Sequence, residues 1–185
     1  MQPYQDILAE ILIDEDTLQK RVKELAEAIN RDYAGEKVLL ICILRGALPF
    51  LVDLMRHITV LNAIDCMAIS SYGAGARETT GNVRMTLDLQ TNIEGKHVIL
   101  VEDIVDSGHT IARVLEMLQT RRPKSLKVCA LLDKASRREV EVPIDYCGFV
   151  IENKFVFGYG LDLDEYYRNL RFVGVVDLER YQSHG

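Results

Sequence analysis

The chain has 185 residues, 48% hydrophobic and 27% charged, a balance typical of globular proteins rather than of disordered or fibrous ones. Its formal net charge of −6 disfavours a nucleic-acid-binding protein, because a basic surface supplies most of the affinity for a phosphate backbone. Neither a signal peptide nor an apolar run of the roughly 18 residues that a membrane span needs is present. We therefore expect one domain over residues 1–185, in the cytoplasm and with no membrane partner.

The four cysteines are far apart in the sequence, and no pair of them has the spacing of a zinc site. This distribution is typical of reduced thiols in a cytosolic protein. The residues are Cys42, Cys66, Cys129 and Cys147.

The first predicted element is a helix over about residues 14–33, with Asp14 or Asp16 as its N-cap. Short continuous apolar runs follow, of the kind that forms strands covered on both faces in parallel sheets. Helical patterns at 46–57 and 110–121 separate some of these strands. The alternation predicts an α/β fold with a mainly parallel central sheet flanked by helices. The predicted strands lie at residues 38–44, 64–69, 98–101, 126–132 and 172–176.

The most informative segment is residues 98–110, VILVEDIVDSGHT, where an apolar strand leads into carboxylates and then into a Ser-Gly-His-Thr turn that opens a helix. Such a turn presents unpaired N–H groups and hydroxyls, which suit a phosphate. We expect Glu102 and Asp103 to stand at the strand end, outside the core, where carboxylates suit sugar hydroxyls or a metal ion.

These thirteen residues resemble the phosphoribosyl pyrophosphate signature of the type I phosphoribosyltransferases, and residues 12–177 resemble the hypoxanthine-guanine branch of that family. The resemblance implies the type I fold, with a small hood formed by terminal segments. It implies transfer of a phosphoribosyl group to a 6-oxopurine base, hypoxanthine and guanine, with Mg²⁺ as cofactor. A homo-oligomer, a dimer or a tetramer, is also expected.

By the same resemblance, Asp106 is the catalytic residue near N7 of the base, and Ser107, Gly108, His109 and Thr110 bind the 5′-phosphate. Glu102 and Asp103 contact the ribose hydroxyls and, with Asp162, the metal ion. Further contacts to phosphoribosyl pyrophosphate are assigned to Arg45, Gly46, Ser71, Tyr72 and Arg168.

The purine base is assigned three contacts. Lys134 donates to the 6-oxygen, Phe155 stacks on the ring, and Val156 offers backbone groups to the polar edge of the base. Two departures qualify the match: Arg45 stands where the family often has lysine, and residues 74–80 follow no recognisable pattern. The resemblance also places a cis peptide before Arg45.

Two alternatives remain open from the sequence. A xanthine-preferring phosphoribosyltransferase would share the signature and differ around Lys134 and Phe155. A non-catalytic nucleotide-sensing regulator on the same fold would need a basic surface or an added DNA-binding domain, which a net charge of −6 and the chain length disfavour.

Overall fold

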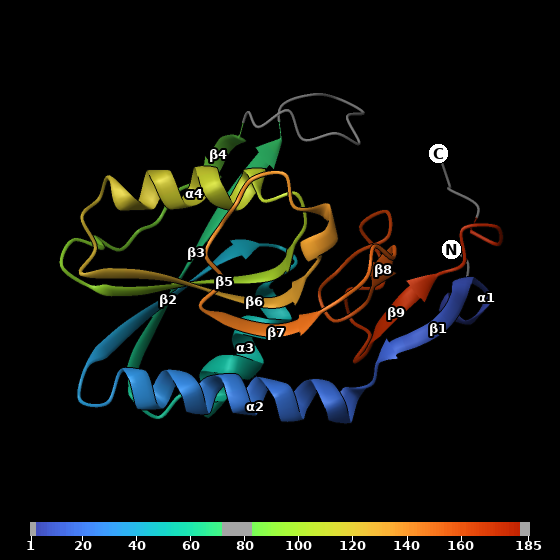
Figure 1. Ribbon diagram of the computed structural model, residues 1–185, viewed down its shortest axis with the longest axis horizontal. Coiled ribbons are helices and arrows are strands. Elements are labelled where there is room, and N and C mark those ends of the chain that lie inside the picture. Colours follow the sequence, from blue (N-terminus) through green and yellow to red (C-terminus); the bar gives the residue numbers. More distant parts are fainter. Residues whose placement is uncertain (1–2, 72–82, 182–185) are drawn as a thin grey trace.

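A six-stranded sheet forms the centre of the structure, a computed structural model that describes residues 3–71 and 83–181 (Figure 1). Neighbouring strands run parallel, except that β3 and β4 are antiparallel. The predicted mainly parallel sheet is therefore confirmed. In spatial order the strands are β4 (Val83–Leu87), β3 (Leu61–Ser71), β2 (Lys37–Leu44), β5 (His97–Val105), β6 (Ser125–Asp133) and β7 (Tyr146–Val150).

Helices cover both faces of this sheet (Figure 1). Helices α2 (Glu15–Asp32) and α3 (Leu48–His57) pack on one face, and α4 (His109–Gln119) packs on the other. Because both faces are covered, the central strands carry continuous apolar runs instead of alternating ones. In β2, the six residues after Lys37 are all buried.

Helix α2 begins where its sequence predicts. The Asp14 carboxylate accepts a hydrogen bond of 2.8 Å from the Thr17 backbone N–H, so Asp14 rather than Asp16 is the N-cap. The apolar face of the helix is buried against the sheet and α3. Its members are Leu18, Val22, Leu25, Ala26 and Ile29.

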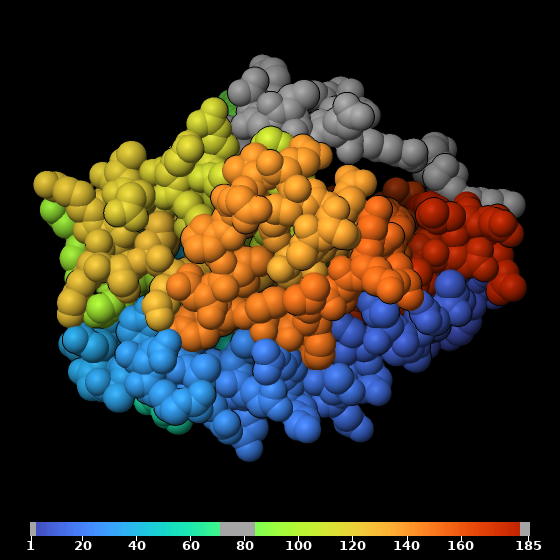
Figure 2. Space-filling view, viewed as in Figure 1, coloured from blue at the N-terminus to red at the C-terminus, as the bar shows by residue number. Residues whose placement is uncertain are grey.

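A second, three-stranded sheet stands beyond one end of the central sheet and joins the two ends of the chain (Figure 1). Its strands are antiparallel, in the order β1 (Leu8–Ile13), β9 (Val173–Val176) and β8 (Val156–Phe157), and α1 (Tyr4–Ile7) precedes them. Figure 2 shows the N-terminal and C-terminal segments side by side at this end. The expected hood is confirmed, and the run at 172–176 belongs to the hood instead of the central sheet.

Strand β5 corrects another expectation. It continues to Val105, so Glu102 and Asp103 lie within the strand and are buried, with only 8% and 9% of their surface exposed. The sequence prediction had ended the strand before them, because adjacent carboxylates rarely occupy a buried strand.

No helix within residues 3–71 and 83–181 has both the length and the apolar character that a membrane span requires.

Candidate active site

The carboxyl ends of β2, β5 and β6 lie next to one another, because these strands are parallel neighbours. Ligands bind outside this edge in open α/β sheets. Arg45 follows β2, Asp106 follows β5, and Lys134 follows β6. The Lys134 backbone N–H donates to the Val105 carbonyl across 2.9 Å, which fixes Lys134 beside the segment that carries Asp106. Three of the predicted site segments are thus brought together.

The turn between β5 and α4 has the form of a phosphate site. Gly108 is the N-cap of α4 with φ of +92°, and the Ser107 carbonyl accepts hydrogen bonds from Glu139 and Val140 at 2.9 and 3.0 Å. The backbone N–H groups of the first turn of α4 therefore face outward from a fixed loop, as anion binding requires. The His109 ring lies 2.9 Å from a Glu139 oxygen, so the side chain of His109 already has a partner.

Two loops and strand β5 meet so closely around Gly46 that a side chain has no room there. A Cβ on Gly46 would lie 1.8 Å from Oδ2 of Asp103, and a Cβ on Gly160 would lie 2.0 Å from the Gly46 carbonyl oxygen. Gly160 also has φ of +99°, a conformation that favours glycine. The peptide bond between Leu44 and Arg45 is cis, as the resemblance predicts.

The two buried carboxylates of β5 have unusual electrostatics. Burial raises the pKa of the Glu102 carboxyl well above its usual range, and the neighbouring Asp103 charge raises it further. Burial also raises the pKa of Asp103, while the Ile104 backbone N–H and the Arg168 charge partly oppose that shift. Oε2 of Glu102 is buried and accepts no hydrogen bond from the described residues. A ligand that brings positive charge or donors would compensate both groups.

Glu102 and Asp103 therefore fit a magnesium ion in chemistry, since carboxylate oxygens are its preferred protein ligands. The third predicted ligand, Asp162, is occupied by Arg168, whose Nη2 lies 2.9 Å from Oδ1. Among the described residues, no three Asp, Glu, His or Cys side chains gather as a metal site. The predicted set is thus not assembled as one cluster.

Asp106 lies between two cations. Its Oδ2 is 4.0 Å from Nζ of Lys134, and its Oδ1 is 3.3 Å from Nε of Arg137, which stands in the short 3-10 helix η1 (Ala135–Arg137). Lys134 is only 7% exposed. Burial lowers the pKa of its ammonium, and the Asp106 carboxylate opposes that shift.

The hood contributes an exposed aromatic ring and a free strand edge. Phe155 is 50% exposed, whereas Phe157 is fully buried. The Val176 N–H donates to the Phe155 carbonyl, and Val156 pairs with Val175. Because hydrogen-bonded and non-hydrogen-bonded pairs alternate along antiparallel strands, the backbone groups of Val156 point away from β9. Strand β8 is the edge of its sheet, so these groups face outward.

Glu165, which the sequence prediction overlooked, engages both predicted pyrophosphate arginines. Its Oε2 forms ion pairs with Nη1 of Arg45 and, at 3.4 Å, with Nη2 of Arg168. Arg168 also donates to the Gly160 carbonyl across 2.9 Å. Arg137 was overlooked as well. Both belong to local sequence that has no motif of its own, and only the fold brings them to the site.

Two predicted residues cannot be placed. Ser71 ends β3 and its backbone pairs with Val83, but its side chain is outside the described part. Tyr72 lies outside the described residues altogether.

Comparison with known proteins agrees with this geometry. The family model for the phosphoribosyl transferase domain matches residues 10–164. A hypoxanthine-guanine-xanthine phosphoribosyltransferase of Tritrichomonas foetus is 44% identical over 175 residues, which are 94% of this chain and 94% of that protein. A hypoxanthine phosphoribosyltransferase of Salmonella typhimurium is 46% identical over 171 residues, 91% of this chain and 96% of that protein. A crystal structure of the Staphylococcus aureus hypoxanthine phosphoribosyltransferase superposes with a TM-score of 0.93 at 38% identity, covering 98% of each chain.

The chain therefore belongs to the phosphoribosyltransferase family, with the type I fold. Within that family, the relatives just described carry the names hypoxanthine and hypoxanthine-guanine-xanthine phosphoribosyltransferase.

Proposed function

We propose that this chain transfers the 5-phosphoribosyl group from phosphoribosyl pyrophosphate to hypoxanthine and guanine, giving IMP or GMP and pyrophosphate. This is a purine salvage reaction. The observation that carries the proposal is the convergence, at one edge of the sheet, of the α4 phosphate turn, the Gly46 loop packed on Asp103, and the buried Lys134 beside Asp106. The names of the relatives support the choice of base.

In the reaction, N9 of the purine forms a bond to C1′ of the ribose, and the bond from C1′ to the pyrophosphate oxygen breaks with its electrons. Positive charge develops on the sugar as the bond breaks. Asp106, opposite N7 of the base, accepts the proton that the base loses, and its negative charge stabilises the cationic sugar. Its position 4.0 Å from Lys134 supports this role, because a base held by Lys134 comes within its reach.

Base recognition uses donors and acceptors in fixed places. The Lys134 ammonium donates to the 6-oxygen, and the exposed ring of Phe155 stacks on the purine. Val156 offers its outward N–H and carbonyl to the polar edge of the base. Ser107, Gly108, His109 and Thr110 hold the 5′-phosphate at the N-terminus of α4.

The leaving pyrophosphate is bound by Arg45, by the backbone at Gly46 and by Arg168, with Ser71 and Tyr72 as further contacts. Glu165 must release both arginines when the pyrophosphate binds. Glu102 and Asp103 would hold Mg²⁺ and the ribose hydroxyls, and Asp162 would join them once Arg168 leaves it for the pyrophosphate. The bound ion would supply charge that stabilises the leaving group.

A product assay tests the proposal. Purified protein incubated with hypoxanthine, phosphoribosyl pyrophosphate and Mg²⁺ should form IMP and pyrophosphate in equal amounts, as chromatography would measure. Chelation of the metal should stop the reaction. Pyrophosphate released at the same rate without a base would mean hydrolysis and would contradict the proposed transfer.

We also propose a homo-oligomer in the cytoplasm. Leu48 and Ile64, 43% and 48% exposed, lie on α3 and β3, where a second copy could cover them. The four cysteines are free thiols, as in proteins of a reducing compartment. Sedimentation velocity would measure the assembly, and a monomer at micromolar concentration would contradict it.

A further inference from the structure

A cavity of about 630 Å³ opens at the amino-terminal ends of β2, β3 and β5, on the edge of the sheet opposite the candidate active site. Its volume is within the range of about 300–1,000 Å³ that small-molecule sites occupy. Strand β2 runs from Lys37 in this cavity to Leu44 beside Arg45. At ~3.3 Å per residue, its two ends are roughly 23 Å apart, so the cavity is separate from the reaction site.

One side of the cavity has its charges paired. Glu36 accepts from Nζ of Lys124 across 3.1 Å, and its other oxygen lies 3.6 Å from Nε2 of His97. Nδ1 of His97 lies 2.7 Å from the Ser125 hydroxyl, which fixes the ring in place. The charges of Glu36 and Lys124 therefore offset each other, and this side offers little net charge to a ligand.

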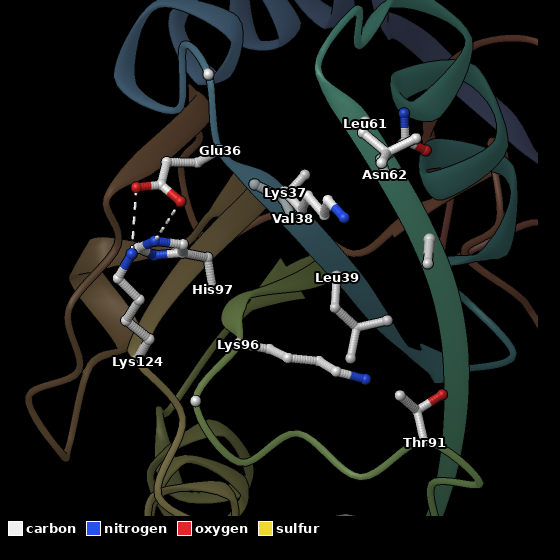
Figure 3. A pocket seen from close by; sticks show the side chains of 13 residues that line it. Glu36, Lys37, Val38, Leu39, Leu61, Asn62, Thr91, Lys96, His97 and Lys124 are labelled. Carbon is white, nitrogen blue, oxygen red and sulfur yellow. Dashed lines mark hydrogen bonds and ion pairs between the residues drawn. The ribbon is translucent and has the colours of Figure 1, made fainter.

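The other side carries unbalanced positive charge. Within residues 3–71 and 83–181, neither Lys37 nor Lys96 forms an ion pair, although both line the cavity. Figure 3 shows the two side chains extending toward β3, with Leu39 between them and Thr91 beyond the end of Lys96. Two ammonium groups thus face one space in a protein whose net charge is −6.

The cavity wall between these charges is apolar. Val38 and Leu39 are buried at its floor, and Leu61, 64% exposed, stands at its rim with Ala63. An exposed leucine beside unpaired lysines is an amphipathic surface. A ligand that covers the apolar wall lowers the free energy of the complex, and the ammonium groups attract an anion.

We propose that this cavity binds a small organic anion, a ring-sized apolar body that bears one carboxylate, sulfonate or phosphate group. The body lies on Leu39 and Leu61, and the anionic group lies between the ammonium groups of Lys37 and Lys96. A bare inorganic anion would lack the apolar contact, and a neutral ring would leave the lysines without a counter-charge.

Calorimetric titration of the full-length protein, saturated with GMP to fill the reaction site, tests the proposal with 2-naphthoate as the probe. We expect saturable binding at one site, with the same affinity in protein that contains no GMP. Lys37→Gln combined with Lys96→Gln should weaken the affinity roughly tenfold, the scale of two partly exposed charge contacts. The control Lys20→Gln, which removes an exposed lysine of α2 outside the cavity, should leave it unchanged. Neutral 2-naphthylmethanol and inorganic phosphate should bind more weakly than 2-naphthoate.

A second variant tests the cavity independently of charge. Ala63→Trp should fill it from the β3 wall and abolish naphthoate binding while IMP formation continues. Three results would overturn the proposal: a weaker affinity for 2-naphthoate with GMP bound than without it, an unchanged affinity in the double-lysine variant, or no binding at all. A second copy of the chain that covers the cavity would also prevent binding.

Discussion

The guanidinium of Arg137 donates to the carboxylate of Asp106 across 3.3 Å, from Nε to Oδ1. Arg137 stands three residues after Lys134, which approaches the other carboxylate oxygen. Asp106 is therefore held in one orientation by two cations, while 41% of its side chain remains exposed to the cleft. The residue is fixed and accessible at the same time, as a proton acceptor must be.

Asp106→Asn keeps the shape of this side chain and removes its charge. We expect kcat to fall by roughly 10²–10⁴-fold, as for loss of a positioned acid–base group. The melting temperature should change little, because exposed ion pairs contribute only about 0–1 kcal/mol. Arg137→Ala is the matched control: it breaks the same ion pair but keeps the carboxylate, so its kcat should fall less than tenfold. Equal losses of kcat in the two variants would mean that catalysis depends on the ion pair and not on proton transfer to Asp106.

Gly46→Ala should damage the site through simple overlap. The new Cβ would lie 1.8 Å from Oδ2 of Asp103, so the loop or the carboxylate has to move. We expect a loss of about 1–3 kcal/mol in the free energy of unfolding, typical of overpacking, together with a fall in kcat/KM of at least about 100-fold. Gly95→Ala is the control, because Gly95 has φ of +70° with no atom near its missing Cβ. That variant should lose stability and keep its activity; a Gly46→Ala enzyme with normal kcat/KM would refute the close packing.

Because Glu165 pairs with Arg45 and Arg168, substitutions of Arg45 and of Glu165 should change the affinity for phosphoribosyl pyrophosphate in opposite directions. Arg45→Ala should weaken phosphoribosyl pyrophosphate binding about tenfold or more and affect IMP binding less, because the product lacks pyrophosphate. Glu165→Gln should tighten phosphoribosyl pyrophosphate binding several-fold, since it frees Arg45 and Arg168 from a competing carboxylate. Calorimetry with each ligand would measure both effects. Equal losses for both ligands in Arg45→Ala would place that arginine outside the pyrophosphate site.

The raised pKa of Glu102 predicts how stability depends on pH. Between the usual value of 4.5 and its raised pKa, the folded protein binds more protons than the unfolded chain, so stability falls as pH rises through that window. Glu102→Gln removes this titration. At about pH 8 and without Mg²⁺, the variant should be more stable than the parent, and the difference should shrink toward pH 5.

Denaturant unfolding at both pH values checks that prediction. Added Mg²⁺ with phosphoribosyl pyrophosphate should stabilise the parent more than Glu102→Gln, because the ion compensates the buried charge. A variant that is less stable than the parent at both pH values would show that Glu102 stabilises the fold.

The sequence predicted those features that depend on neighbouring residues. Asp14 caps α2 with its own side chain, the apolar run of β2 marks a buried strand, and residues 106–108 form the turn that opens the amphipathic helix α4. Each is decided within a few residues along the chain. The resemblance then supplied roles for strand-end residues such as Lys134, which the structure brings beside Asp106.

Features that depend on distant contacts were missed or misplaced. Strand β1 pairs with β9, more than 150 residues later, and neither short run reveals its partner. Glu102 and Asp103 looked too polar for a buried strand, yet β5 continues through them. Glu165 is unremarkable in sequence, and only the fold places it against Arg45.

Base selectivity tests the central claim most directly. The buried Lys134 ammonium has three donors and no acceptor, so it can satisfy a 6-oxo group but faces the 6-amino group of adenine donor to donor. Steady-state kcat/KM should be measured for hypoxanthine, guanine, xanthine and adenine, with phosphoribosyl pyrophosphate and Mg²⁺ saturating. We expect hypoxanthine and guanine to exceed adenine by about 10⁴–10⁵-fold, and Lys134→Gln to narrow that ratio, chiefly by losing activity with hypoxanthine. Efficient use of adenine by the unaltered protein, or of xanthine in preference to both other 6-oxopurines, would contradict the account.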